Sequence, residues 1–168
     1  LVKDGYRIAQ TAIASHYYFG FSKFEQNLKK AVHYYELAAL QGCPDAQEAL
    51  GRIYYHGTEG VSANYDLAFK YWEQASDQGK ANAQSSLGTM YARGVGVSRD
   101  DYKATKLFKL AAKQGDIEGK RFLARSYLKG LGVKKNTDKA ISLYKQIAKD
   151  VDIANYFLGE IYTEKKDF

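Results

Sequence analysis

Arginine and lysine are the residues of this sequence whose spacing best suggests chemistry. Arg121 and Arg125 are four residues apart, so they share one face if this segment is helical. Arg93 and Lys129 stand 36 residues apart at equivalent places. Guanidinium groups form paired, charge-assisted hydrogen bonds with carboxylates, which favours recognition of an acidic partner.

Catalysis and metal binding lack the residue patterns that they need. His16, His33 and His56 include no pair four residues apart, and no Glu/His zinc motif is present. Cys43 is the only cysteine, which excludes an internal disulfide, and no histidine or carboxylate marks it as a nucleophile. We therefore expect no enzyme, no metal and no cofactor, and we interpret Cys43 as a tolerated loop thiol.

The composition is that of an ordinary soluble globular protein. Of 168 residues, 45% are hydrophobic and 26% are charged, and no run approaches the ~20 apolar residues of a membrane span. The net charge is +6. Residues 99–149 contain 14 basic and 5 acidic residues, whereas 1–98 are balanced, which predicts a local cationic surface.

The start of the chain leaves the compartment open. The sequence begins with Leu1 rather than Met, which indicates a processed or truncated product. No signal peptide is visible, so export after removal of a signal peptide remains one of the alternatives.

A repeat of 35–37 residues supplies the elements that position these side chains. In each copy a small residue, Leu or Ile, Gly or Ala, and Tyr fall at i, i+4, i+5 and i+8, which is one face of a helix. The copies are 9–20, 46–57, 83–94, 119–130 and 154–162. The small residue at position i+5 of each copy predicts the close approach of a neighbouring helix. These residues are Ala14, Gly51, Gly88, Ala124 and Gly159.

A second amphipathic helix follows in each copy. In each of the first four copies, one residue of a type preferred at the N-cap precedes this helix. These residues are Asn27, Asn64, Asp100 and Asn136. Glycines that suit a left-handed helix end follow it, namely Gly42, Gly79 and Gly115. A single hairpin of this size cannot bury its own apolar face, so the hairpins must stack.

The repeat resembles the Sel-1-like repeat, a relative of the tetratricopeptide repeat, most clearly from Ala83 to Gly115. The resemblance implies an all-α fold, an α/α superhelical solenoid of about four and a half repeats. We expect a single repeat domain over 1–168. Its repeats are expected at about 5–42, 43–79, 80–115 and 116–150, with a half-repeat or cap at 151–168.

The resemblance also implies a non-catalytic scaffold or adaptor that binds a partner protein or peptide. By analogy with tetratricopeptide arrays, the first helix of each repeat lines the concave surface, where we expect an acidic partner to dock. The candidate binding residues are Arg52, Tyr55, Arg93, Arg121, Arg125 and Lys129. The alternative function is an immunity protein that blocks a secreted bacterial toxin. Nucleic-acid binding is not expected, because no recognition motif is present.

Overall fold

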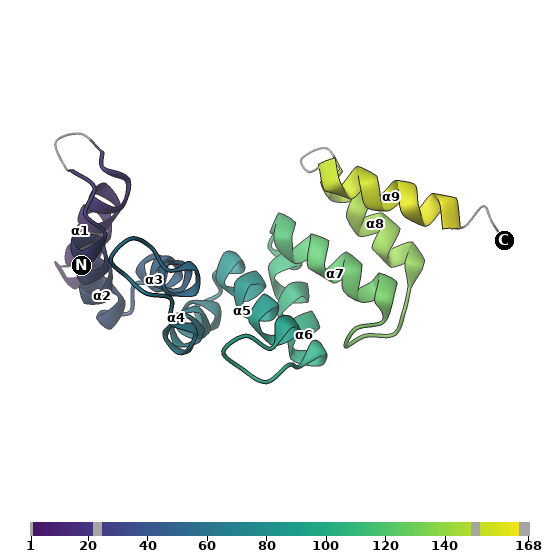
Figure 1. Ribbon diagram of the computed structural model, residues 1–168, viewed down its shortest axis with the longest axis horizontal. Helices are drawn as coiled ribbons and strands as arrows, with labels where there is room; N and C mark the ends of the chain where they lie inside the picture. Colours follow the sequence, from purple (N-terminus) through teal and green to yellow (C-terminus); the bar gives the residue numbers. More distant parts are fainter. Residues whose placement is uncertain (1, 22–24, 149–151, 165–168) are drawn as a thin grey trace. The chain divides into compact units, whose positions relative to one another are not determined.

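The computed structural model describes residues 2–21, 25–148 and 152–164, and these residues form α-helices without a β-strand. This confirms the expected all-α class (Figure 1). The helices are α1 (Val2–Phe19), α2 (Leu28–Leu40), α3 (Pro44–His56), α4 (Tyr65–Asp77), α5 (Ala81–Arg93), α6 (Asp101–Lys113), α7 (Ile117–Lys129), α8 (Thr137–Ile147) and α9 (Asp152–Glu164). Of the expected half-repeat, residues 151 and 165–168 lie outside the described residues.

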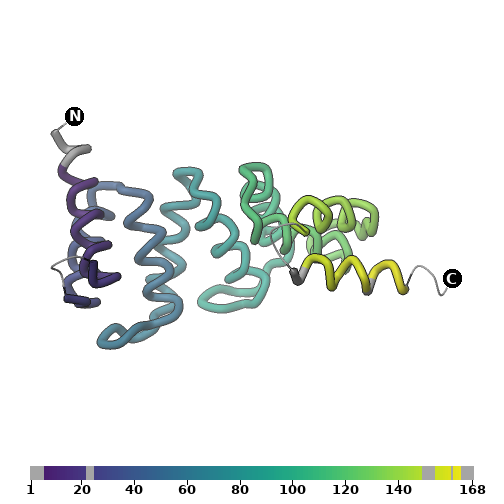
Figure 2. Tube along the Cα trace, turned by 90° about the horizontal axis from the view of Figure 1, so that it is seen from above, coloured from purple at the N-terminus to yellow at the C-terminus, as the bar shows by residue number. Residues whose placement is uncertain are grey.

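Successive helices form antiparallel hairpins, which Figure 2 shows as paired coils along the chain. The hairpins are α1–α2, α3–α4, α5–α6 and α7–α8. The chain divides into two compact units, unit 1 (Leu1–Ala83) and unit 2 (Gln84–Phe168). Within unit 1, α2 also packs on α3, and within unit 2, α7 packs on α6 and α9 on α8. Each unit therefore buries its own apolar core.

The N-cap predictions are confirmed at all four second helices. The side-chain oxygens of the four caps accept hydrogen bonds from the backbone N–H three residues on, at 2.9–3.0 Å. The caps are Asn27, Asn64, Asp100 and Asn136. Each cap satisfies one of the N–H groups that a helix start leaves without an intrahelical partner.

Replacing Asn64 by alanine is expected to lower the free energy of unfolding by about 1 kcal/mol. The Leu67 N–H, 3.0 Å from the Asn64 side-chain oxygen, would lose its partner. Urea denaturation measures the effect. An Asn64→Asp variant keeps the acceptor and should stay near the wild-type stability, so equal loss in both variants would contradict the capping role.

Close helix approach is confirmed at Gly51 and Gly88. A β-carbon at Gly51 would lie 2.7 Å from Cγ of Trp72, and one at Gly88 would lie 2.6 Å from Cε1 of Phe108. The expectation for Gly159 was wrong, because no described residue outside its own stretch of helix comes within 4 Å of a β-carbon built there. The physical reason is that α9 is followed by no further described helix that could pack on this glycine.

The second helices end as the glycine pattern predicts. Gly42 follows directly after Gln41, the C-cap residue of α2. Its φ of 77° is in the left-handed region, which glycine adopts at little cost in free energy. The same backbone conformation recurs at Gly79 and Gly115.

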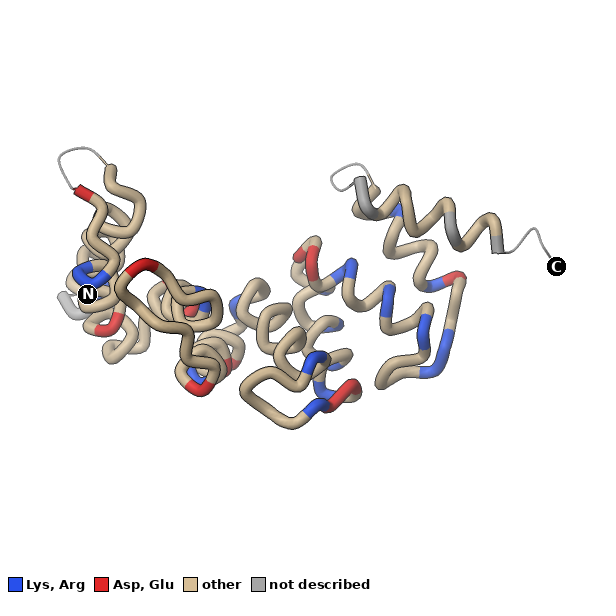
Figure 3. Tube along the Cα trace, in the orientation of Figure 1, with Lys and Arg blue, Asp and Glu red and all other residues tan. Residues whose placement is uncertain are grey.

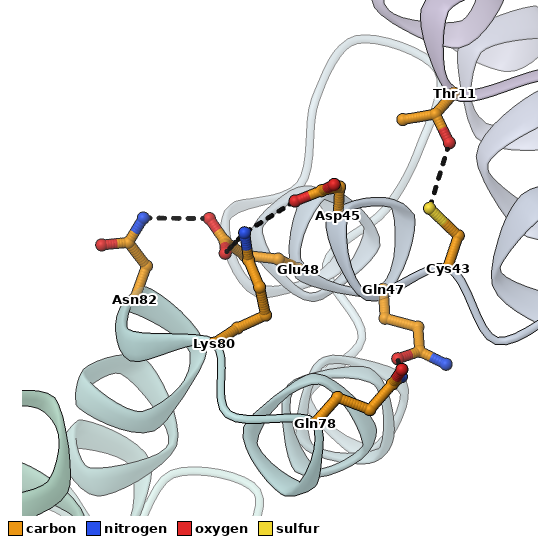
Figure 4. Close-up of polar contacts among 8 residues, drawn as sticks. All are labelled: Thr11, Cys43, Asp45, Gln47, Glu48, Gln78, Lys80 and Asn82. Carbon is orange, nitrogen blue, oxygen red and sulfur yellow. Dashed lines mark hydrogen bonds and ion pairs between the residues drawn. The ribbon is translucent and has the colours of Figure 1, made fainter. Parts of the chain in front are cut away.

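Paired glutamines join the two helices of a hairpin, a feature that the sequence reasoning missed. The Gln78 amide donates a 2.7 Å hydrogen bond to Oε1 of the buried Gln47 (Figure 4). Equivalent pairs, at 2.6 and 2.8 Å, are Gln41–Gln10 and Gln114–Gln84. The recurrence of glutamine at positions 10, 47 and 84 was the available signal. Because a buried amide must be hydrogen-bonded, each pair fixes how its helices pack.

Cys43, which we interpreted as a tolerated loop thiol, is a buried residue of the core, and this corrects our interpretation. Its side chain is 4% exposed, and its Sγ lies 3.3 Å from the Thr11 hydroxyl (Figure 4). It is the residue before α3, which starts at Pro44, and the start of α3 is packed against the core of unit 1. Burial makes Cys43 a small apolar residue in this core.

A polar cluster ties α3 to the turn that precedes α5. Lys80 Nζ lies 2.6 Å from Asp45 Oδ1 and 3.7 Å from Glu48 Oε2, and Asn82 donates to Glu48 Oε1 at 3.1 Å (Figure 4). The hydrogen bond to Asp45 raises the pKa of Lys80. Lys80 therefore stays charged and holds the two acidic side chains of α3 together.

Candidate partner-binding site

A pocket of about 240 Å³ opens in unit 2 where α5 and α7 flank α6. The side of α5 that faces α6 approaches it closely at Gly88, and α7 packs directly on α6. Residues from all three helices and from the loops after α5 and α7 line the pocket. They are Thr89, Ala92, Arg93, Arg99, Asp101, Ala104, Thr105, Phe108, Phe122, Arg125, Ser126 and Leu131.

Two of the arginines expected at the binding site share this pocket. Arg93 ends α5 and Arg125 lies in the middle of α7, and both side chains are exposed. Within the part of the chain that the structure describes, neither forms an ion pair or a hydrogen bond. Their guanidinium groups are therefore available to an incoming anion.

A third arginine in the pocket, Arg99, is already paired. Its Nε and Nη2 donate to the two carboxylate oxygens of Asp101 at 3.1 and 2.8 Å. Asp101 raises the pKa of Arg99 through this bond, and the side chains of Arg99 and Asp101 are 59% and 28% exposed. The sequence reasoning did not select Arg99, although it lies in the cationic segment 99–149.

Arg121 is engaged on its own helix. It forms a bidentate ion pair with Glu118, and its guanidinium carbon lies 4.2 Å from the centre of the Phe122 ring. Arg121 does not line the pocket. The Arg121 and Glu118 side chains are 23% and 52% exposed, and ion pairs near the surface are weak, so Arg121 can exchange Glu118 for another carboxylate at a modest cost.

The remaining candidate residues do not line the pocket. Lys129 is exposed at the end of α7, outside the pocket lining. Arg52 and Tyr55 are on α3 in unit 1, where Arg52 lies 5.6 Å above the Tyr18 ring. Tyr55 is half-buried against Trp72, with ring centres 5.1 Å apart, so only part of its ring is accessible to a partner.

Part of the pocket lining, which we call the floor, is aromatic and consists of Phe108 and Phe122. The rings of Phe108 and Phe122 are stacked, with centres 5.0 Å apart, and Phe108 is 2% exposed. Thr105 lies beside them, with its hydroxyl 2.8 Å from the Leu131 carbonyl oxygen and 3.1 Å from Ser126 Oγ. These hydrogen bonds tie Thr105 of α6 to α7 and to the loop that follows it.

The cationic character of unit 2 extends beyond the pocket. Figure 3 shows lysine and arginine along α6, α7 and the loop that follows α7. Desolvation raises the pKa of the buried Tyr144 hydroxyl on α8, while the charges of Arg121 and Arg125 partly oppose that shift. The positive charges of Arg121 and Arg125 on α7 therefore act on the Tyr144 hydroxyl of the neighbouring helix.

The described residues also bear on metal binding and on membrane insertion. No three or more His, Cys, Asp or Glu side chains gather there as metal ligands. Among the helices described, none has the length and hydropathy needed to cross a bilayer.

A family model for the Sel1 repeat matches the sequence four times in succession, at residues 7–43, 44–80, 81–116 and 117–150. These matches cover most of the chain. The chain belongs to the Sel1 repeat family. The proposed resemblance is thus confirmed, and with it the α/α solenoid class. Sel1 repeat proteins generally mediate protein–protein interactions and are typically non-enzymatic scaffolds.

Solved structures give similar folds. A Sel1 repeat protein from Oxalobacter formigenes is 32% identical with a TM-score of 0.87, and covers 95% of this chain. The protective antigen c5321 of uropathogenic Escherichia coli, which has this fold, is 31% identical with a TM-score of 0.85 over 94% of this chain. Cysteine-rich protein B of Helicobacter pylori is 25% identical, with a TM-score of 0.62 over 79% of this chain and 96% of its own.

The Sel1 repeat chain spans only part of the first two of these proteins, 34% of the E. coli antigen and 63% of the O. formigenes protein. The immunity protein Pa5087 of Pseudomonas aeruginosa shares the fold. It is 20% identical, with a TM-score of 0.51 over 88% of this chain and 70% of its own. A search of curated proteins gives no match.

Proposed function

We propose that this Sel1 repeat chain is a non-catalytic scaffold or adaptor that binds an acidic partner protein or peptide. The binding surface comprises the cationic side chains of α5 and α7, with Arg93 and Arg125 at its centre. Arg121 and Lys129 extend it along α7, and Arg52 with Tyr55 offers a further contact on α3.

The observation that carries this proposal is the pair of arginines without a described ion-pair partner, Arg93 and Arg125, in one pocket. Two like charges held near one another repel, and a carboxylate placed between them removes that repulsion. Arginine also suits this role because its fork of donors matches a carboxylate. The family's general role in protein interaction supports the same function.

Reversing both charges, in an Arg93→Glu/Arg125→Glu variant, is expected to weaken capture of the native partner by at least about tenfold, since each lost charged hydrogen bond contributes more than 1 kcal/mol. The partner is identified by affinity capture from the native source, and its affinity is then measured with purified components. Circular dichroism should show unchanged helical content in the variant.

The matched control is a Lys106→Glu/Lys113→Glu variant. It changes the net charge by the same amount at two exposed positions of α6 that do not line the pocket. The proposal requires this control to bind nearly as the wild type does. Equal loss of partner binding in both variants would mean that the effect comes from overall charge. Unchanged partner binding in the Arg93→Glu/Arg125→Glu variant would contradict the assignment of the site.

The alternative role, toxin neutralisation by an immunity protein, predicts a different profile from the same capture. One partner with nanomolar affinity would favour neutralisation, whereas several partners of moderate affinity would favour an adaptor. The likeness to the Pseudomonas immunity protein concerns the fold and does not separate the two roles.

A further inference from the structure

We propose that the pocket of unit 2 binds a carboxylate joined to an apolar group, as an acidic peptide segment presents it. This inference rests on the proposed function, because it specifies which chemical feature of the partner enters the pocket. The carboxylate is either the C-terminus of a chain that ends in an apolar residue or an Asp or Glu side chain beside one.

The charge of the lining selects an anion. Three arginines, Arg93, Arg99 and Arg125, face a single carboxylate, Asp101. Because Arg99 and Asp101 satisfy one another, the excess positive charge lies on Arg93 and Arg125. A neutral ligand would leave both guanidinium groups without a counter-charge.

The floor selects an apolar group next to that anion. Phe122, which stacks on the buried Phe108, is partly exposed in the pocket lining, and the partly exposed side chains of Ala92 and Leu131 continue the apolar surface. A small inorganic anion would contact the guanidinium groups but would not cover this apolar surface. A ligand with an apolar side chain would remove that surface from water, which is favourable.

The size of the pocket limits the ligand to a short element. About 240 Å³ lies below the ~300–1,000 Å³ of sites for drug-sized ligands, so one or two side chains fill it. Contacts among and behind the lining residues support the shape of the pocket. Gly88 lets Phe108 lie directly against α5, and the Thr105 hydroxyl is held by the Leu131 carbonyl oxygen.

The test titrates the whole chain with four small probes, by calorimetry and by NMR. The first is an acetylated glycine–glycine–phenylalanine peptide with a free C-terminal carboxylate, and the second is the same peptide with a C-terminal amide. The third is an acetylated glycine–glutamate–phenylalanine amide, and the fourth is acetate. The first or the third probe, or both, should bind at least about tenfold more tightly than the second and the fourth.

The pattern of binding identifies the source of the carboxylate. Binding of the first probe alone assigns a chain terminus, binding of the third alone assigns an acidic side chain, and binding of both supports the shared chemistry. Equal binding of the amide would overturn the charge requirement, and equal binding of acetate would overturn the apolar one. Failure of the first and third probes to saturate at millimolar concentration would overturn the proposal.

Variants locate the site. Arg125→Gln should weaken the binding of the carboxylate probes by about tenfold, while Lys120→Gln, which removes one charge from the same helix outside the pocket, should leave it unchanged. Asp101→Asn should tighten binding severalfold, because it releases Arg99 and removes the negative charge. Weaker binding by Asp101→Asn, or equal binding by the two glutamine variants, would contradict the assignment.

The outcome is separable from that of the proposed function. If the probes fail but the Arg93→Glu/Arg125→Glu variant loses its protein partner, the scaffold role stands and the pocket is not its anchor. If the probes bind as expected while that variant keeps its partner, the pocket chemistry stands and the partner uses another surface.

Discussion

Truncating Tyr144 to alanine is expected to lower the free energy of unfolding by about 3–5 kcal/mol. The Tyr144 side chain is 1% exposed, and its ring stacks on Phe157 of α9 with centres 5.3 Å apart. It belongs to a core cluster that also contains Ile147 and Ile161. Loss of the ring removes both its buried apolar surface and the contact that holds α9 on α8.

The loss should be local, because each element of a repeat array contacts only its neighbours. Hydrogen exchange is expected to show lost protection in α8 and α9, with α1–α4 unchanged. A Tyr102→Ala variant serves as the control, since Tyr102 is 71% exposed on α6 and its truncation should cost less than about 0.5 kcal/mol. Uniform loss of protection along the whole chain after the Tyr144 change would contradict the local role.

A Gly51→Ala substitution is expected to destabilise unit 1 by about 1–3 kcal/mol, although alanine favours a helix over glycine by ~1 kcal/mol. The new β-carbon would lie 2.7 Å from Cγ of Trp72 and closer still to Cδ1 and Nε1. Trp72 is 5% exposed and is packed against Tyr55, so the ring has no space into which it can move. Urea or thermal denaturation measures the change.

Gly159→Ala is the matched control for that substitution. Gly159 also lies inside a helix, but among the described residues none outside its own stretch of helix lies within 4 Å of a β-carbon there. The helix propensity of alanine should therefore act alone and stabilise α9 by up to about 1 kcal/mol. Opposite signs in the two variants are expected, and stabilisation by Gly51→Ala would contradict close helix packing at Trp72.

The local parts of the fold were predictable from the sequence. Asn27, Asn64, Asp100 and Asn136 were selected as caps from residue type and spacing, and each accepts the expected backbone hydrogen bond. A cap involves residues only three apart, so the neighbouring sequence is sufficient to specify it.

The burial of Cys43 and the glutamine pairs required the tertiary structure. Cys43 occupies a turn in the sequence pattern, and only the packing of α1 and α2 around the start of α3 places it in the core. Gln47 and Gln78 are 31 residues apart, so their hydrogen bond depends on how the helices of one hairpin cross. Residue type and spacing within one helix carry no information on that crossing.

For the candidate site, the residue types were predictable but their grouping was not. Periodicity selected Arg93, Arg121 and Arg125 as surface cations on the first helices of their repeats. Whether an arginine of this region already forms an ion pair depends on acidic neighbours that the pattern did not identify. Glu118 pairs with Arg121, and Asp101 pairs with Arg99.

The sequence by itself determined that the chain is a tandem array of capped helical hairpins with a cationic C-terminal half, because helix periodicity, capping and charge are local properties. The tertiary structure decided which cations are available and what lies beneath them. Arg93 and Arg125 line one pocket with Phe108 and Phe122 only because α5 and α7 both pack on α6, and that packing depends on the shapes of side chains far apart in the sequence.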